Sequence, residues 1–203
     1  MARVGVLALQ GDFPMHEKRL RELGCEVRQV RNAADLTGLE ALVWPGGEST
    51  TMTRVMSDEL RTALLSFCSA HPVWGTCAGM IMLSHTDVDP RVKTLGIADV
   101  HVNRNGWGRQ VHSFEGELRL VPELTEKKPC VGMFIRAPRI TSVGNEVRVL
   151  AWYRDEPVAV SQGNILLTTF HPELTDDDRF HRLLLSWIIE PHKNRTASTG
   201  DRN

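Results

Sequence analysis

Apolar residues in the first half of the chain gather in short runs separated by amphipathic segments. VGVLAL (4–9), ALVW (41–44) and PVWGTC (72–77) are compact apolar runs, typical of strands buried on both faces of a sheet. CEVRQV (25–30) alternates instead, which predicts a strand nearer the sheet edge. These runs predict a sheet whose strands are parallel and covered by helices.

The segments between these runs have helical patterns. PMHEKRLREL (14–23) begins with a proline suited to a first helical turn and ends before Gly24. The segment 58–70 places Leu60, Leu64, Leu65 and Cys68 on one face, and a further helix is expected over 78–84. This alternation of strands and helices predicts an α/β fold with helices on both faces of a mostly parallel sheet.

After about residue 95 the pattern changes to strand-like segments joined by Gly and Asn turns, and one helix is expected over about 176–189. Thr175 and Asp178 resemble a capping box at its start, so the acidic run 176–178 is interpreted as helix capping rather than catalysis. The helix has an apolar stripe, made of Phe180, Leu183, Leu184, Trp187 and Ile188. We therefore predict one domain over residues 1–191 and a polar, disordered tail over 192–203.

Composition narrows the class of protein. The chain has 203 residues with 24 basic and 25 acidic side chains, which fits one domain and lacks the basic excess of a nucleic-acid-binding protein. No apolar run is long enough for a membrane span or shaped like a signal peptide. Four cysteines lie far apart without a CxxC pair, which argues against a zinc site or a disulfide framework. These features predict a cytoplasmic protein with no membrane or nucleic-acid partner and no metal or cofactor.

Cys77 lies in GTCAG (75–79), between an expected strand and an expected helix. This is the sequence context of a nucleophile elbow with Cys in place of Ser, in which the flanking glycines allow a sharp, closely packed turn. The N-terminus of the next helix would favour the thiolate. The alternative is an inert buried thiol, which is the usual state of a free cysteine.

His171 and Glu173 end the strand-like segment NILLTTF (164–170) in the sequence HPE. In extended backbone, residues two apart point the same way, and Pro172 favours that geometry, so the two side chains can project together. A cysteine nucleophile needs such a base and a group that orients the base. Taken alone, however, each residue also fits a strand end and a helix entry.

PGGES (45–49) follows the strand 41–44, and its glycines would let backbone N–H groups face a ligand or a developing oxyanion. An ordinary turn is the alternative. The three signals coincide at the carboxyl ends of expected strands, where open α/β sheets bind ligands, and this coincidence favours Cys77 as a nucleophile. The order Cys77, His171, Glu173 differs from the nucleophile–acid–histidine order of α/β-hydrolases.

These residues resemble those of the class I (triad) glutamine amidotransferases. Longer stretches narrow the resemblance to the glutaminase subunits of pyridoxal 5′-phosphate synthases: GVLALQGD with His16 nearby, PGGESTTM, GTCAGMI, VNRNGWGRQVHSFEGEL, FIRAP and FHPELTDD. The resemblance covers residues 4 to about 189. Trp107 departs from it, standing where Tyr or Phe is expected.

The resemblance implies a flavodoxin-like fold, a mixed sheet between helices, and the hydrolysis of L-glutamine to glutamate and ammonia. Cys77 would attack, His171 would move the proton, and Glu173 would hold the His171 ring. The ammonia would pass to a separate synthase (lyase) subunit within a large hetero-oligomer. Glutamine would be bound by residues at six positions, namely Gly46, Gly47, Glu48, Arg104, Ile135 and Arg136.

Backbone N–H groups of Gly47 and Ala78 are the candidates for the oxyanion hole, and Gln10 is a candidate to sense the partner. Other interpretations stay open at this point: a glutaminase serving another synthase, a cysteine hydrolase of similar fold, or a non-catalytic regulatory subunit.

Overall fold

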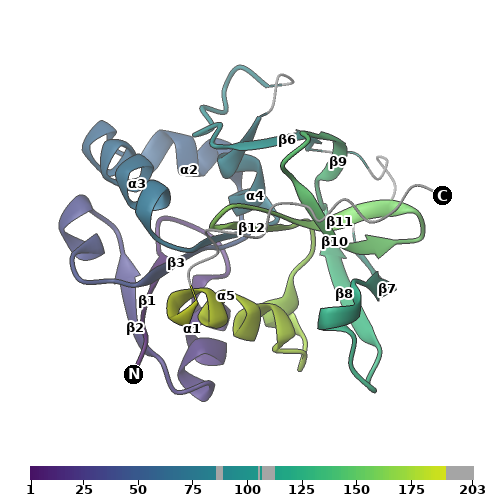
Figure 1. Ribbon diagram of the computed structural model, residues 1–203. Helices are drawn as coiled ribbons and strands as arrows, with labels where there is room; N and C mark the ends of the chain where they lie inside the picture. The colour runs from purple at the N-terminus through teal and green to yellow at the C-terminus, as the bar shows by residue number, and fades with distance from the viewer. Residues whose placement is uncertain (86–88, 105, 107–112, 191–203) are drawn as a thin grey trace.

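The computed structural model describes residues 1–85, 89–104, 106 and 113–190. Within these ranges the chain forms a nine-stranded mixed sheet and a three-stranded sheet (Figure 1). The predicted tail, 192–203, and the end of the predicted domain at residue 191 lie outside the described residues. None of the helices in the described ranges is long and apolar enough to cross a membrane.

The strands within these ranges are β1 (Arg3–Leu7), β2 (Glu26–Val30), β3 (Ala41–Trp44), β4 (Val73–Thr76), β5 (Ser84–His85), β6 (Ala98–Asn103), β7 (Ser113–Leu120), β8 (Cys130–Ile135), β9 (Arg139–Val143), β10 (Arg148–Tyr153), β11 (Glu156–Gln162) and β12 (Ile165–Thr168). The helices are α1 (Phe13–Glu22), α2 (Ser49–Val55), α3 (Asp58–Ala70), α4 (Ala78–Leu83) and α5 (Arg179–Ile189), with short 3₁₀ turns η1 (Ala33–Leu36), η2 (Pro122–Leu124) and η3 (Pro172–Leu174).

The large sheet has a parallel and an antiparallel half. Strands β2-β1-β3-β4-β12 pair in parallel, which is the strand order of flavodoxin-like folds. On the other side of β12 the series β11-β10-β7-β8 is antiparallel. The predicted fold class is confirmed, and β12 lies at the boundary with its carboxyl end beside that of β4.

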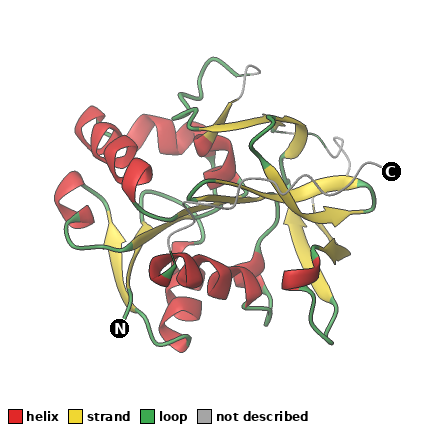
Figure 2. Cartoon of the chain, viewed as in Figure 1, coloured by secondary structure: helices red, strands yellow, loops and turns green. Residues whose placement is uncertain are grey.

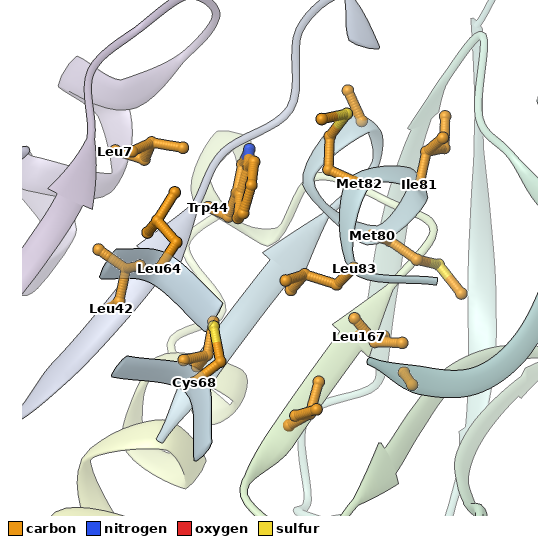
Figure 3. Close-up of a cluster of buried hydrophobic side chains, with 14 of the residues drawn as sticks. Leu7, Leu42, Trp44, Leu64, Cys68, Met80, Ile81, Met82, Leu83 and Leu167 are labelled. Carbon is orange, nitrogen blue, oxygen red and sulfur yellow. The ribbon is translucent and has the colours of Figure 1, made fainter. Parts of the chain in front are cut away.

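Helices cover both faces of the large sheet (Figure 2). On one face α2, α3 and α4 pack over a core that includes Trp44, Leu64 and Met82, shown in close-up in Figure 3. On the other face α1 and α5 pack over a second core, to which Leu20 and Phe180 contribute. Both faces of the parallel strands are therefore covered, which explains why their sequences are continuous apolar runs.

The bounds of β3 and α3 agree with the patterns that predicted them, whereas two other predictions need correction. The helix expected from residue 176 begins at Arg179, after η3; its N-cap residue, Asp178, makes no capping hydrogen bond, whereas Asp177 accepts from the Arg179 N–H at 3.2 Å. The Thr175 hydroxyl donates to the Pro172 carbonyl at 3.0 Å rather than capping that helix. Leu65, expected on the buried face of α3, is 40% exposed.

A further difference is α2, which the sequence did not predict. Its seven residues, STTMTRV, are mostly polar or β-branched and too few to show an apolar period. The buried Met52 holds this helix against the core shown in Figure 3. Tertiary packing rather than intrinsic propensity therefore fixes this helix after the PGGE turn.

Candidate active site

Cys77 lies at a sharp turn between β4 and α4. Its backbone has φ +48° and ψ −106°, a conformation that L-residues rarely adopt. Its N–H donates to the Thr168 carbonyl at 2.8 Å, which fastens the turn to the end of β12. This is the strand–turn–helix geometry expected of a nucleophile elbow.

The two glycines around Cys77 are required by packing. A Cβ on Gly75 would lie 2.7 Å from the Gly79 carbonyl carbon, and a Cβ on Gly79 would lie 1.9 Å from the Trp44 carbonyl oxygen. Both distances are shorter than any real Cβ contact, so a side chain at either position would force the backbone apart. The GxCxG spacing therefore reflects contacts of the turn with itself and with the end of β3.

His171 and Glu173 follow β12 and form a buried pair. The Nδ1 of His171 lies 2.7 Å from Glu173 Oε1, and the side chains are 4% and 0% exposed. Because the carboxylate accepts a hydrogen bond, Nδ1 carries a proton, and Nε2 is the ring nitrogen that remains for Cys77. The predicted pairing of His171 with Glu173 is present in the structure.

Electrostatics favour a charged His171. Burial alone would lower its pKa, but the hydrogen bonds to Cys77 and Glu173 outweigh burial and raise the pKa to about 10. Burial also opposes the ionised form of Glu173, yet the nearby His16 and the hydrogen bond to the charged His171 hold the pKa of this carboxyl below its usual value. The pair is therefore arranged as imidazolium and carboxylate, with the cysteine sulfur as the third member.

A cleft of about 150 Å³ opens over these side chains. Cys77 and His171 both line it, and so do six of the residues predicted for glutamine or oxyanion binding: Gly47, Glu48, Ala78, Arg104, Ile135 and Arg136. Gly46 lies directly behind the histidine, because a Cβ there would come within 2.4 Å of His171 Cε1. The predicted residues thus come together around one cavity.

Three further residues line the cleft that the sequence did not single out, namely Asp12, Ser49 and Ile81. Asp12 follows the carboxyl end of β1, and that position could have drawn attention to it because ligands bind at such ends. Ser49 belongs to α2, which had no periodic signal. Ile81 lies one turn along α4 from Cys77 and is a core residue by sequence.

The Gly46–Gly47 loop is held by the segment after β1. The Gly46 carbonyl accepts from the Asp12 N–H at 3.3 Å, and the Gln10 side-chain oxygen accepts from the Glu48 N–H at 2.6 Å. The C=O and the following N–H of a trans peptide point in opposite directions, so the Gly47 N–H is directed away from the Asp12 N–H. The Ala78 N–H begins α4 and has no acceptor within the helix. The roles of the Gly47 and Ala78 N–H groups as oxyanion donors stay predictions.

The two arginines have different surroundings. Arg104 donates to Asp89 at 2.5 Å, and its other terminal nitrogen lies 4.0 Å from Glu48. Arg136 is exposed and has φ +44°, directly after Ile135, whose carbonyl lies 3.8 Å from the Cys77 sulfur. Within the motif around Arg104, residue 105 and residues 107–112, which include Trp107, lie outside the described residues.

One group of potential metal ligands lies at the site. Asp12, His171 and Glu173 each place a ligand atom within 4.8 Å of the others. The hydrogen bond between His171 and Glu173 already uses two of these groups, so we assign the cluster to the triad. The metal-free site stays a prediction.

A flavodoxin-like sheet with a cysteine at the β4–α4 turn and a buried His–Glu pair after the neighbouring strand is typical of one class of protein, the triad glutamine amidotransferases. The model of the SNO glutamine amidotransferase family matches residues 6–190. The chain belongs to this family.

Relatives and a solved structure agree with this family. The chain is 44% identical to the pyridoxal 5′-phosphate synthase subunit PdxT of Kosmotoga olearia, covering 92% of this chain and 98% of the relative. It is 48% identical to the subunit of the same name in Kineococcus radiotolerans, with coverage of 92% and 95%. A crystal structure described as a glutamine amidotransferase is similar with a TM-score of 0.84 and 42% identity, covering 91% of this chain and 98% of that one.

Proposed function

We propose that this chain is the glutaminase subunit of a pyridoxal 5′-phosphate synthase and that Cys77, His171 and Glu173 carry the hydrolysis. The family and the names of the relatives support the activity. The observation that carries the residue roles is the cleft that Cys77 and His171 share, with Glu173 bonded behind the histidine. The reaction releases ammonia from the side-chain amide of L-glutamine and leaves L-glutamate.

The first half of the reaction forms a thioester. The Cys77 thiolate attacks the amide carbon, and the carbonyl oxygen takes the negative charge toward the Gly47 and Ala78 N–H groups. The protonated His171 gives its Nε2 proton to the amide nitrogen, the C–N bond breaks, and ammonia leaves. Glu173 keeps the ring in place and stabilises its charge throughout.

The second half regenerates the thiolate. Water attacks the thioester carbon while neutral His171 accepts its proton. The C–S bond breaks, the new carboxyl group releases the second proton of the water to solvent and leaves as glutamate, and the first proton stays on His171 beside the restored thiolate. The pKa of His171, raised to about 10, suits this resting state.

The charged residues around the cleft fit the head group of an amino acid. Glu48 is an anion for the substrate ammonium, while Arg104 and Arg136 are cations for its carboxylate. The ammonia then needs a partner, because in water it becomes protonated and loses its nucleophilicity. We infer a synthase subunit in a large hetero-oligomer as that partner, in the cytoplasm, with no cofactor in this chain.

The test is glutamate release from L-glutamine by the purified chain, alone and with increasing amounts of a matching synthase subunit. Activity that rises on titration and is absent in Cys77→Ala supports the proposal. No glutamate release at any ratio would contradict it.

The same titration tests whether the orientation of the Gly46–Gly47 peptide regulates activity. We infer that docking sets the orientation of this peptide: from the β1–α1 segment, Asp12 bonds to its carbonyl and Gln10 bonds to the next N–H, that of Glu48. A missing oxyanion donor costs about 10²–10³ in kcat, enough to keep the free subunit nearly silent. Full activity without the synthase would contradict this control and leave the triad assignment intact.

A further inference from the structure

His16 lies behind the catalytic pair, on the side of Glu173 that faces away from His171. It projects from α1 and is completely buried. Its Nε2 lies 3.3 Å from Glu173 Oε2 and 3.2 Å from the Thr76 hydroxyl. The two oxygens of the Glu173 carboxylate therefore have different neighbours, Oε1 beside His171 and Oε2 beside His16.

The outer oxygen of Glu173 depends on this contact. Oε2 is buried, and no described residue makes a well-aligned hydrogen bond to it. The ring nitrogen that faces this oxygen is His16 Nε2, at 3.3 Å. A buried carboxylate oxygen without a donor is costly, so this imidazole decides whether the outer half of Glu173 is satisfied.

The surroundings of His16 fix which ring nitrogen carries the proton. Its Nδ1 is buried and has no hydrogen-bond partner among the described residues. The ring is packed between Trp74 and His181, with centroid distances of 5.4 and 5.5 Å. A proton on Nδ1 would have no acceptor, whereas a proton on Nε2 can bond to the Thr76 oxygen at 3.2 Å and faces Glu173 Oε2 at 3.3 Å.

The charge of His16 follows from its burial. Burial lowers its pKa despite the nearby Glu173 carboxylate, while the proximity of His171 lowers it further and Asp12 raises it. His181 behind it is neutral too, because burial lowers the pKa of that imidazole to about 3. A neutral ring supplies one N–H donor without adding a second buried cation next to His171.

We propose that His16 is a positioning residue for glutamine hydrolysis: its Nε2–H attracts the outer oxygen of Glu173 across 3.3 Å, so that the inner oxygen stays aligned with His171 Nδ1. The proposal rests on the proposed function. His16 does not line the cleft, so it acts on the histidine only through the carboxylate.

The helix that carries His16 is itself fastened to the segment after Glu173. One turn along α1, Arg19 donates to the Thr175 carbonyl and, at 2.8 Å, to the Asp176 carboxylate. These bonds fix α1 relative to η3 on the same face as His16, since residues three apart are neighbours on a helix. The distance between His16 and Glu173 is thus set by two connections, one buried and one near the surface.

Two amide substitutions separate a role of the Nε2–H from a role in packing. In His16→Gln the side-chain NH₂ replaces Nε2 and can reach Glu173, while in His16→Asn it replaces Nδ1 and falls short. Both bury an amide of similar polarity. We expect His16→Asn to lower kcat by about 10- to 100-fold, as for residues that orient metal-binding histidines, with KM changed by less than about threefold. His16→Gln should recover to within about threefold of wild type.

A double-mutant cycle tests whether the effect passes through Glu173. If His16 acts only on the carboxylate, His16→Asn should lower kcat by less than about twofold in a Glu173→Ala background. A merely structural role would cost the same factor in both backgrounds. The control is His181→Leu, which removes a buried neighbouring imidazole whose nitrogens bond to no described residue, and it should leave kcat within about threefold of wild type.

All variants are assayed in the complex with the synthase subunit, with unfolding temperatures measured in parallel. Equal losses of kcat in His16→Asn and His16→Gln would overturn the proposal. So would a His16→Asn substitution that lowers kcat by the same factor in the Glu173→Ala background as in the wild type. A measurement on the wild-type chain is independent of variant folding: ¹⁵N NMR of labelled histidine should show His16 neutral with its proton on Nε2, and an Nδ1–H tautomer would overturn the proposal. Wild-type and Cys77→Ala rates in the same assay report separately on the proposed function.

Discussion

The two sides of the cleft are built differently. On the side of the triad, Cys77, His171 and Glu173 are buried and fastened to the carboxyl ends of β4 and β12 by backbone and side-chain hydrogen bonds. Elsewhere in the lining of the cleft, on what we call its open side, Arg136 is exposed, and Arg104 pairs with Asp89. The triad is therefore positioned by the fold, whereas the two arginines proposed for recognition are either exposed or paired with Asp89.

This difference predicts which substitutions should lower kcat and which should raise KM. A group that is preorganised by the core contributes to the transition state whatever the substrate does. A group on the open side contributes to binding, and it must exchange a protein partner for a substrate atom. The four predictions below test this division.

Cys77→Ala should have the largest effect. Only the sulfur can form the thioester, so glutamate release should fall by about 10⁴-fold or more, with the fold retained and synthase binding unchanged. The measurement is steady-state glutamate production in the complex. Cys68→Ala is the control, since that thiol is buried in the core under α3, and it should stay within about threefold of wild type. Residual turnover near wild type in Cys77→Ala would remove the cysteine from the mechanism.

His171→Asn should come next, with a loss of about 10³–10⁴-fold in kcat, because no other group at the sulfur moves the proton. Glu173→Ala should be impaired to a similar or lesser degree, since the carboxylate only orients and stabilises the ring. Single-turnover rates of thioester formation in both variants measure this order. Normal activity of the Glu173 variant would reduce that residue to a charge at the start of η3.

Gly46→Ala should lower kcat by displacing the His171 ring. The new Cβ would lie 2.4 Å from His171 Cε1, so the ring must move, and a displacement of about 1 Å costs about 10² in kcat. Gly163→Asn is the matched control, because nothing lies within 4 Å of its Cβ position and Asn tolerates its positive φ. A Gly46→Ala enzyme with wild-type kcat would show that the histidine is not confined as the structure indicates.

Arg104→Ala should have the smallest of these effects on chemistry. Losing a charge-assisted contact to the substrate carboxylate raises KM by about tenfold, with kcat within about threefold. Arg148→Ala removes an arginine from a surface ion pair with Glu123 and serves as the control for charge alone. A loss confined to kcat would place Arg104 on the chemical side and break the division between the two sides.

The sequence predicted those parts of the fold whose signals are local. The bounds of β3 and α3 follow from a continuous apolar run and from a helical stripe, and the elbow at Cys77 follows from two glycines that packing requires. The His171–Glu173 pair was also within reach, because two residues in extended backbone share a direction.

The features that the sequence did not predict depend on contacts between distant segments. His16 meets Glu173 across 157 positions of chain, and nothing in the amphipathic pattern of α1 distinguishes a histidine behind a carboxylate from one in a core. The pairing of Arg104 with Asp89 likewise joins two loops without periodicity. The predicted start of α5 was wrong because Thr175 bonds back to the Pro172 carbonyl and Asp177 accepts from the Arg179 N–H, where the helix begins.

The backbone conformation at Cys77 makes stability and catalysis compete. A non-glycine residue at φ +48° stores strain of about 1–3 kcal/mol, a sizeable part of the roughly 5–15 kcal/mol that keeps an ordinary domain folded. Glycine would relieve that strain and abolish the enzyme. Selection for thermal stability alone would therefore favour an inactive subunit with glycine at this position. A screen for thermostable variants of this chain must measure glutamate release as well as resistance to heat.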